Sequence, residues 1–277
     1  MIALGLNTVF DAATLSASIG FRNELPLLNL KNAWLPWVAR TVDASAFSLT
    51  LSWLSPISIG LVMLANHNFG SHAKVRLTWS LDGAVLGSSG EVLVWPVYKG
   101  DVQKSSALRS DFTFTLPTNT MIKQLVIEVV QPQVASYSQI GRVFVGEQWV
   151  PSLGVEYGAA QLGLVARSSV QTSPSGFRFG ASLTPLREVQ IGFSALSTTE
   201  AIDVLFTAQR NADLLGEVVY VGVIPTWVAV PGFGGALAIS RAEYTQCFLA
   251  NFKEFNPLSQ AFFNGYSCSV SLTEVAV

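Results

Sequence analysis

The chain of 277 residues carries 16 Lys and Arg against 18 Asp and Glu, a formal net charge of −2; 12% of its residues are charged and 50% hydrophobic. Ordinary globular domains carry about 25% charged residues, so this composition excludes a disordered tail and a solvated coiled coil. Without a cluster of Lys or Arg, the chain lacks the basic footprint of nucleic-acid binding. Its low charge density predicts association with copies of itself or with other chains.

Targeting segments and disulfides are not expected. The N-terminal residues have no basic leader and reach Asp11 early, so no secretion signal is predicted. The most apolar run, residues 57–65, is far shorter than the roughly 18 residues that a spanning helix needs, so no membrane span is expected. Cys247 and Cys268 are too few for a disulfide scaffold and lack histidine partners for zinc. We expect two buried thiols.

Short stretches of alternating apolar and polar residues predict β-strands through the first half of the chain. In the clearest stretch, Phe47, Leu49 and Leu51 share one face. The dipeptide Asp82-Gly83 has hairpin chemistry, because Gly tolerates the positive φ of a tight turn. Six strands spaced by turn residues favour an antiparallel β-sandwich. They are expected at residues 46–53, 57–64, 73–80, 91–96, 111–116 and 121–130.

A domain boundary is expected near residues 149–152, because Pro151 interrupts strand pairing and a stretch with Gly154, Gly158 and Gly163 follows. This divides the chain into a β-sandwich domain, residues 1–152, and a second mostly β domain, residues 153–277. The second domain is predicted to carry one α-helix near residues 198–210. Its strands are expected at 161–169, 176–183, 188–194, 218–224, 235–240 and 267–275.

The predicted helix has a clear start. Ser197 and Glu200 form the capping-box signature, in which both side chains satisfy free backbone amides at a helix start. Its apolar residues then recur at helical spacing, so one face is expected to pack on a sheet. These residues are Ala201, Val204, Leu205 and Ala208.

The sequence indicates no catalytic centre. His67 and His72 are the only histidines, and no Cys or carboxylate lies within several residues of them, so no metal site is predicted. We expect instead a polar loop that satisfies its own backbone through Asn66 and Asn68. No G-x-S-x-G elbow occurs, no carboxylate pair stands out, and the glycines at 232–235 lack phosphate-loop spacing. We therefore expect neither an enzyme nor a cofactor.

Trp34 and Trp37 are the most suggestive aromatic residues, because they lie in the irregular stretch LKNAWLPWVAR. Exposed indoles at a sandwich end could stack on the apolar face of a sugar ring. The alternative is that both rings plug the open end of the sandwich. With the neighbouring loop, the candidate glycan-contacting residues are Trp34, Trp37, His67 and Asn68.

Three segments of this chain resemble a family of tailed-phage proteins: NLKNAWLPWVAR, IGLVMLANHNFGSHAKVRL (residues 59–77) and IGRVFVGEQWVPSLGVEYG (residues 140–158). The family is similar to tail-tip or baseplate components of long-tailed phages and prophages. The resemblance covers about the first 160 residues and implies a galactose-binding, discoidin-like jelly roll as the first domain.

The resemblance, together with the apolar composition, predicts a non-enzymatic structural component of a phage tail tip or baseplate. It would assemble in the host cytoplasm into a homo-oligomeric ring or trimer and contact other tail proteins in the virion. The alternative is a carbohydrate-binding module that recognises host surface glycans during adsorption. A fold alone does not decide between them.

Overall fold

The structure is a computed structural model that describes residues 2–43, 46–98, 101–102, 111–131, 136–153, 155, 160–212, 216–262 and 265–276. Gly154 and Gly158, which we expected in the boundary stretch, lie outside these residues. The described chain is mostly β with largely antiparallel pairing, as predicted. It forms two compact units: unit 1 is Met1–Val150 with Val218–Leu249 and Val277, and unit 2 is Pro151–Glu217 with Ala250–Ala276. The division at residue 152 stays a prediction.

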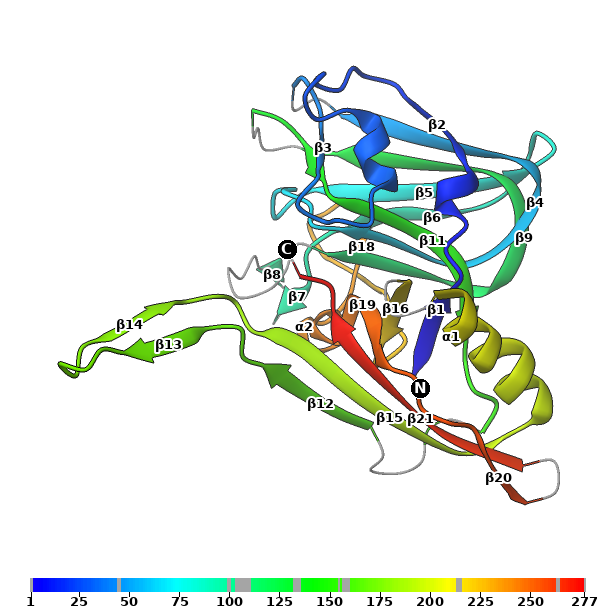
Figure 1. Ribbon diagram of the computed structural model, residues 1–277. Helices are drawn as coiled ribbons and strands as arrows, with labels where there is room; N and C mark the ends of the chain where they lie inside the picture. The colour runs from blue at the N-terminus through cyan, green and yellow to red at the C-terminus, as the bar shows by residue number, and fades with distance from the viewer. Residues whose placement is uncertain are drawn as a thin grey trace. The chain divides into compact units, whose positions relative to one another are not determined.

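Unit 1 contains a jelly-roll sandwich whose strands lie in the order β16-β1-β11-β4-β9-β5-β6-β18-β17, with β2 paired to β4 (Figure 1). The pairing of β6 with β18 is parallel. The main strands are β1 (Ala3–Leu6), β2 (Thr14–Ala17), β4 (Phe47–Ala65), β5 (Lys74–Leu81), β6 (Ala84–Leu93), β9 (Phe112–Val130), β11 (Arg142–Trp149) and β16 (Glu217–Val221). The short ones are β3 (Ala39–Arg40), β7 (Val97–Tyr98), β8 (Asp101–Val102), β10 (Gln139–Ile140), β17 (Val228–Ala229) and β18 (Leu237–Ala238).

Strands β4 and β9 are each longer than the sequence predicts. The expected strands at 46–53 and 57–64 are one strand of 19 residues, and so are those at 111–116 and 121–130. The pairing of β4 with β9 shifts register between Ser52 and Ile57, where Leu54 and Pro56 are exposed. A bulge bends a strand and tolerates proline. Figure 1 shows both strands curving, which carries them around the core.

The core of unit 1 follows the predicted faces. Phe47, Leu49 and Leu51 are 4%, 2% and 0% exposed, while the alternate residues of this stretch are only partly buried. The Asp82-Gly83 turn is confirmed, with φ of 48° and 86° and direct pairing of Leu81 with Ala84. The short 3-10 helices η1 (Phe10–Ala12) and η2 (Leu27–Lys31) contribute buried Phe10 and Leu30 to the same core.

Unit 2 is built on the strand order β12-β15-β21-β19, with β20 also paired to β21; of β19 it includes only the residues from Ala250 on. Its strands are β12 (Ala160–Val165), β13 (Ser169–Thr172), β14 (Arg178–Ala181), β15 (Leu186–Leu196), β19 (Cys247–Glu254), β20 (Ser259–Phe262) and β21 (Gly265–Glu274). Strands β13 and β14 pair only with each other within the described chain, and they form a separate hairpin that extends from β12 and β15 (Figure 1).

The long helix of unit 2 begins where its capping signature predicts. The Glu200 amide donates to Ser197 Oγ at 3.3 Å, and the Ser197 amide donates to the Glu200 carboxylate at 3.1 Å. Its first part, η3 (Thr199–Phe206), has the wider turns of a π-helix, and α1 (Thr207–Ala212) follows. Ala201, Leu205 and Ala208 are buried as expected, whereas Val204 is half-buried. None of the helices in the described residues has the length and apolar character that a membrane crossing requires.

Helix α2 (Arg241–Thr245) is an element that the sequence reading missed. Ser240 and Glu243 form a second capping box, with the same Ser-x-x-Glu spacing that marked the first helix. The signal was therefore present in the sequence. The signature alone does not predict a helix here, because only one turn follows and no apolar periodicity supports it.

Candidate functional site

The turn that carries Trp34 and Trp37 follows helix η2 in unit 1. The Trp34 amide donates to Asn32 Oδ1 at 2.9 Å, and the Trp37 amide donates to the Trp34 carbonyl at 2.9 Å. Asn32 thus forms an Asx turn, and residues 34–37 close a hydrogen-bonded β-turn. Just beyond, the Asn29 side-chain amide donates to the Val38 carbonyl at 2.9 Å and fixes the exit of the turn.

Leu35 anchors this turn to the sandwich. Its side chain is 1% exposed, and its carbonyl accepts a hydrogen bond from the Asn66 side-chain amide at 3.0 Å. Gly141 lies against the same point, since a Cβ placed on it would lie 2.8 Å from the Leu35 carbonyl oxygen. Glycine is needed here because the backbones approach too closely for a side chain.

The two indoles point away from this anchor. Trp34 is 65% exposed and Trp37 53% exposed, with ring centroids 6.5 Å apart and planes inclined by 27°. Of the two alternatives left by the sequence, the rings therefore do not plug the sandwich. They form an exposed, nearly parallel aromatic pair, which offers broad apolar faces edged by indole N–H donors.

Helix η2 is held in place by an ion pair. The Arg142 guanidinium is 2% exposed and donates to both Asp11 carboxylate oxygens, at 2.7 and 3.0 Å. It also donates to the Leu30 carbonyl at 3.0 Å, while the Lys31 ammonium donates to the backbone carbonyl of Asp11. A bidentate pair fixes orientation as well as distance. The aromatic turn consequently starts from a rigid base.

A cationic cluster that the sequence did not reveal lies directly after the turn. Arg40, in β3, lies over the Tyr137 ring at 4.1 Å, and Arg22 lies over the same ring at 5.5 Å. The Arg40 guanidinium also donates to Gln139 Oε1 at 2.8 Å. Cation–π contacts of this kind orient guanidinium groups without consuming all of their donors. Isolated arginines and a distant tyrosine left no pattern that sequence reasoning could detect.

His67 and Asn68, the other two sequence candidates, have structural contacts. His67 is 2% exposed, stacks on Phe69 at 4.5 Å, and accepts the Phe69 amide on Nδ1 at 3.3 Å. Asn68 accepts the Gln139 amide at 2.7 Å and donates to the Tyr137 carbonyl at 3.1 Å. Their part in ligand binding stays a prediction. Their contacts tie the 66–69 loop to the core and to β10 with the preceding Tyr137, whose ring lies under the two arginines.

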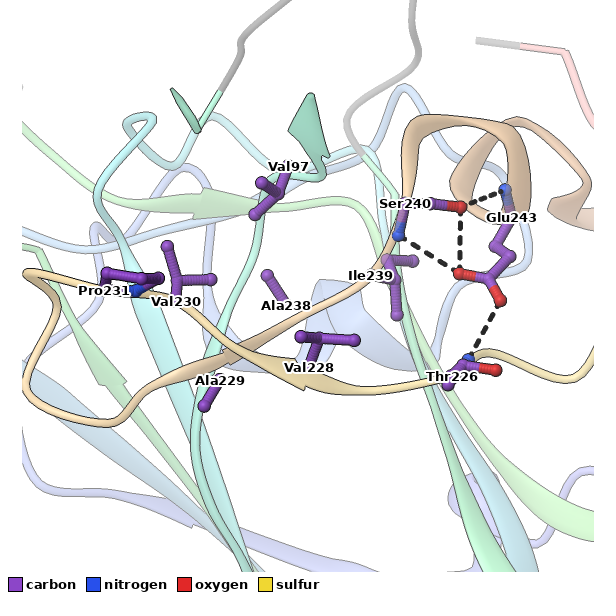
Figure 2. Close-up of a pocket in the computed structure, with 10 residues that line it drawn as sticks. All are labelled: Val97, Thr226, Val228, Ala229, Val230, Pro231, Ala238, Ile239, Ser240 and Glu243. Atoms are coloured by element: carbon purple, nitrogen blue, oxygen red, sulfur yellow. Dashed lines mark hydrogen bonds between the residues drawn. The ribbon is translucent and has the colours of Figure 1, made fainter. Parts of the chain in front are cut away.

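Unit 1 also contains an apolar pocket of about 470 Å³ beside β17 and β18 (Figure 2). Among the described residues that line it, Glu243 is the only ionisable one. Figure 2 shows that this carboxylate is engaged by the Ser240 amide, the Ser240 hydroxyl and the Thr226 amide, at 2.9–3.1 Å. The carboxylate is therefore committed to capping α2. The pocket is lined by Val97, Thr226, Val228, Ala229, Val230, Pro231, Ala238, Ile239, Ser240 and Glu243.

The remaining groups with possible chemistry are dispersed. No group of three or more His, Cys, Asp or Glu side chains among the described residues is placed to hold a metal ion. Cys247 and Cys268 are buried thiols outside any disulfide, as predicted. Burial raises the pKa of the Cys268 thiol to about 11, so it is a poor nucleophile near neutral pH.

No protein-family model matches the chain, and no curated protein sequence does so. Several solved structures resemble part of it. One is the family 32 CBM from C. perfringens NanJ in complex with galactose. Its sequence is 13% identical, the match covers 53% of this chain and 99% of that chain, and the TM-score is 0.39. Another is a Streptococcus pneumoniae fucose binding module, SpX-3. Its sequence is 7% identical, the match covers 50% of this chain and 97% of that chain, and the TM-score is 0.38. The likeness spans about half of this chain and concerns the fold alone.

Proposed function

We propose that this protein is a carbohydrate-binding module and that Trp34 and Trp37 form its sugar-stacking surface. The observation that carries the proposal is the exposed, nearly parallel indole pair on an anchored turn. Large aromatic side chains are usually packed, so two of them displayed together mark a binding site. The C–H face of a pyranose ring is apolar and suits an indole face, and its hydroxyls suit nearby donors.

The turn reduces the entropic cost of binding because its backbone is ordered before a ligand binds. Leu35, its hydrogen bond from Asn66 and the Asn32 turn fix the backbone that carries both rings. A preorganised site loses less conformational entropy when it binds. Arg22 and Arg40, held against Tyr137, supply guanidinium donors, and Arg40 follows Trp37 by three residues in the chain.

The test is a glycan array on the full chain, followed by titration of the strongest hit while Trp fluorescence is recorded. Trp34→Ala and Trp37→Ala are each expected to weaken binding at least about tenfold, as removal of a central aromatic contact does. Phe255→Ala is the matched control, because Phe255 is 46% exposed but belongs to unit 2. Absence of any glycan hit, or unchanged affinity in both Trp variants, would refute the proposal.

A second candidate function is structural: a non-enzymatic component of a phage tail tip or baseplate, located in the virion. It is supported by the exposed apolar side chains of unit 2, among them Leu164 (73% exposed), Phe177 (68%) and Phe179 (60%). Exposed apolar groups in such number favour burial in an assembly. The test is detection of the chain in purified particles by mass spectrometry. Its absence from particles whose genome encodes it would reject this role.

A further inference from the structure

The segment from residue 160 to residue 188 contains no buried side chain among those described, although most of it is ordered as strand. It includes the edge strand β12 and, beyond it, the β13–β14 hairpin. We call residues 167–183, which contain this hairpin, the arm. Fixing a backbone costs about 1–2 kcal/mol per residue, and burial normally offsets that cost. An isolated two-stranded hairpin is at best marginally stable in water. The arm therefore needs a covering surface.

Local contacts define the shape of the arm but bury nothing. At its base, the Leu183 amide donates to Ser168 Oγ at 2.9 Å, and at its tip the Phe177 amide donates to Ser173 Oγ at 3.1 Å. Gly176 adopts φ of +84° in the turn between them. The hairpin is thus specified by its turn and its closing hydrogen bonds. Its two phenylalanines are 68% and 60% exposed, so they contribute little to a core.

The charge of this region identifies the covering surface. Residues 160–186 contain Arg167 and Arg178 and no acidic residue, whereas the rest of the chain holds 14 basic and 18 acidic residues. The arm is therefore cationic and the remainder of the chain is anionic. If two arms packed against each other, four arginines would share one interface, and the arms have no acidic residue to neutralise them. The opposite charge lies on the rest of the chain, so a second copy can supply it outside its own arm.

We infer that the arm docks on a second copy of this chain, outside that copy's own arm, through Phe177, Phe179 and the two arginines. Such a head-to-tail contact is heterologous and generates a closed ring or an open filament. The outer edge of β12 adds backbone groups that a neighbour can pair with, because β12 pairs only with β15 in the described chain. This inference goes beyond glycan binding and stands or fails independently of it.

The experiment is sedimentation velocity of the full chain over a concentration series, with the double variant Phe177→Ser/Phe179→Ser. The wild-type chain is expected to associate, and the double variant to raise the dissociation constant at least about a hundredfold, tenfold per side chain. Leu54→Ser is the control, because Leu54 is 99% exposed but lies in unit 1. Its association should match the wild type. At a concentration where the wild type is monomeric, circular dichroism and thermal unfolding should be unchanged in both variants, since neither substitution touches a core.

Two further measurements separate the proposal from its rivals. Arg178→Glu should weaken association and reduce its dependence on salt, because it removes charge complementarity. Hydrogen exchange should show arm amides protected at high protein concentration and exposed at low concentration. A chain that stays monomeric, a double variant that associates like the wild type, or an arm protected at every concentration would overturn the inference. The last result would mean that the arm packs within its own chain.

Discussion

The pair Leu51→Ala and Leu54→Ala tests the core of unit 1 with one chemical change at two positions of β4. Leu51 is 0% exposed and lies opposite Leu125, itself 0% exposed, whereas Leu54 is 99% exposed. Removing three carbons from Leu51 forfeits about 2.4 kcal/mol at roughly 0.8 kcal/mol each, and the unfilled cavity raises the total to about 3–5 kcal/mol. For Leu54→Ala the expected change is within about 0.5 kcal/mol.

Urea unfolding followed by circular dichroism measures the difference between the two variants from the shift in midpoint at constant slope. Because both substitutions change the same residue type in the same strand, differences in strand propensity largely cancel. A loss below about 1 kcal/mol for Leu51→Ala, or an equal loss for both, would refute the assigned faces of β4. A changed slope would instead indicate that cooperativity between the units has changed.

Further predictions concern the site and unit 2. Gly141→Ala should weaken glycan binding while both indoles remain, because its methyl group would press on the Leu35 carbonyl; calorimetry with the array hit measures this. Burial raises the pKa of Glu200, but hydrogen bonds from two serines outweigh it, so the pKa lies below 4.5. Its stabilisation is present above about pH 4.5 and lost as the pH falls through the lowered pKa, so Glu200→Gln should flatten the acid limb of the stability curve. At pH 8, Cys268 should react with a thiol reagent only as the protein unfolds. Ser240→Ala should cost about 1 kcal/mol, seen in thermal unfolding, through loss of the α2 cap.

Much of the fold was predictable from local sequence. Alternation at Phe47, Leu49 and Leu51 identified a half-buried strand, because side chains on a strand point to opposite faces in turn. The Asp82-Gly83 turn and the Ser197–Glu200 cap were equally readable, since each depends on a few adjacent residues. The joining of two predicted strands into β4 was not predictable. Pro56 indicates an interruption locally, and only pairing with β9 on both sides of the bulge shows that the strand continues.

The candidate site likewise has a part that the sequence predicts and a part that it does not. The sequence by itself determined that Trp34 and Trp37 lie in an irregular stretch, because residue type and local spacing are visible there. Only the tertiary structure decided that the rings are exposed, since burial depends on what the rest of the chain brings alongside. Arg40 meets Gln139 across 99 positions of sequence, and Leu35 meets Asn66 across 31. Contacts at such separations have no periodic trace in the sequence, so the shape of the site is a property of the folded chain.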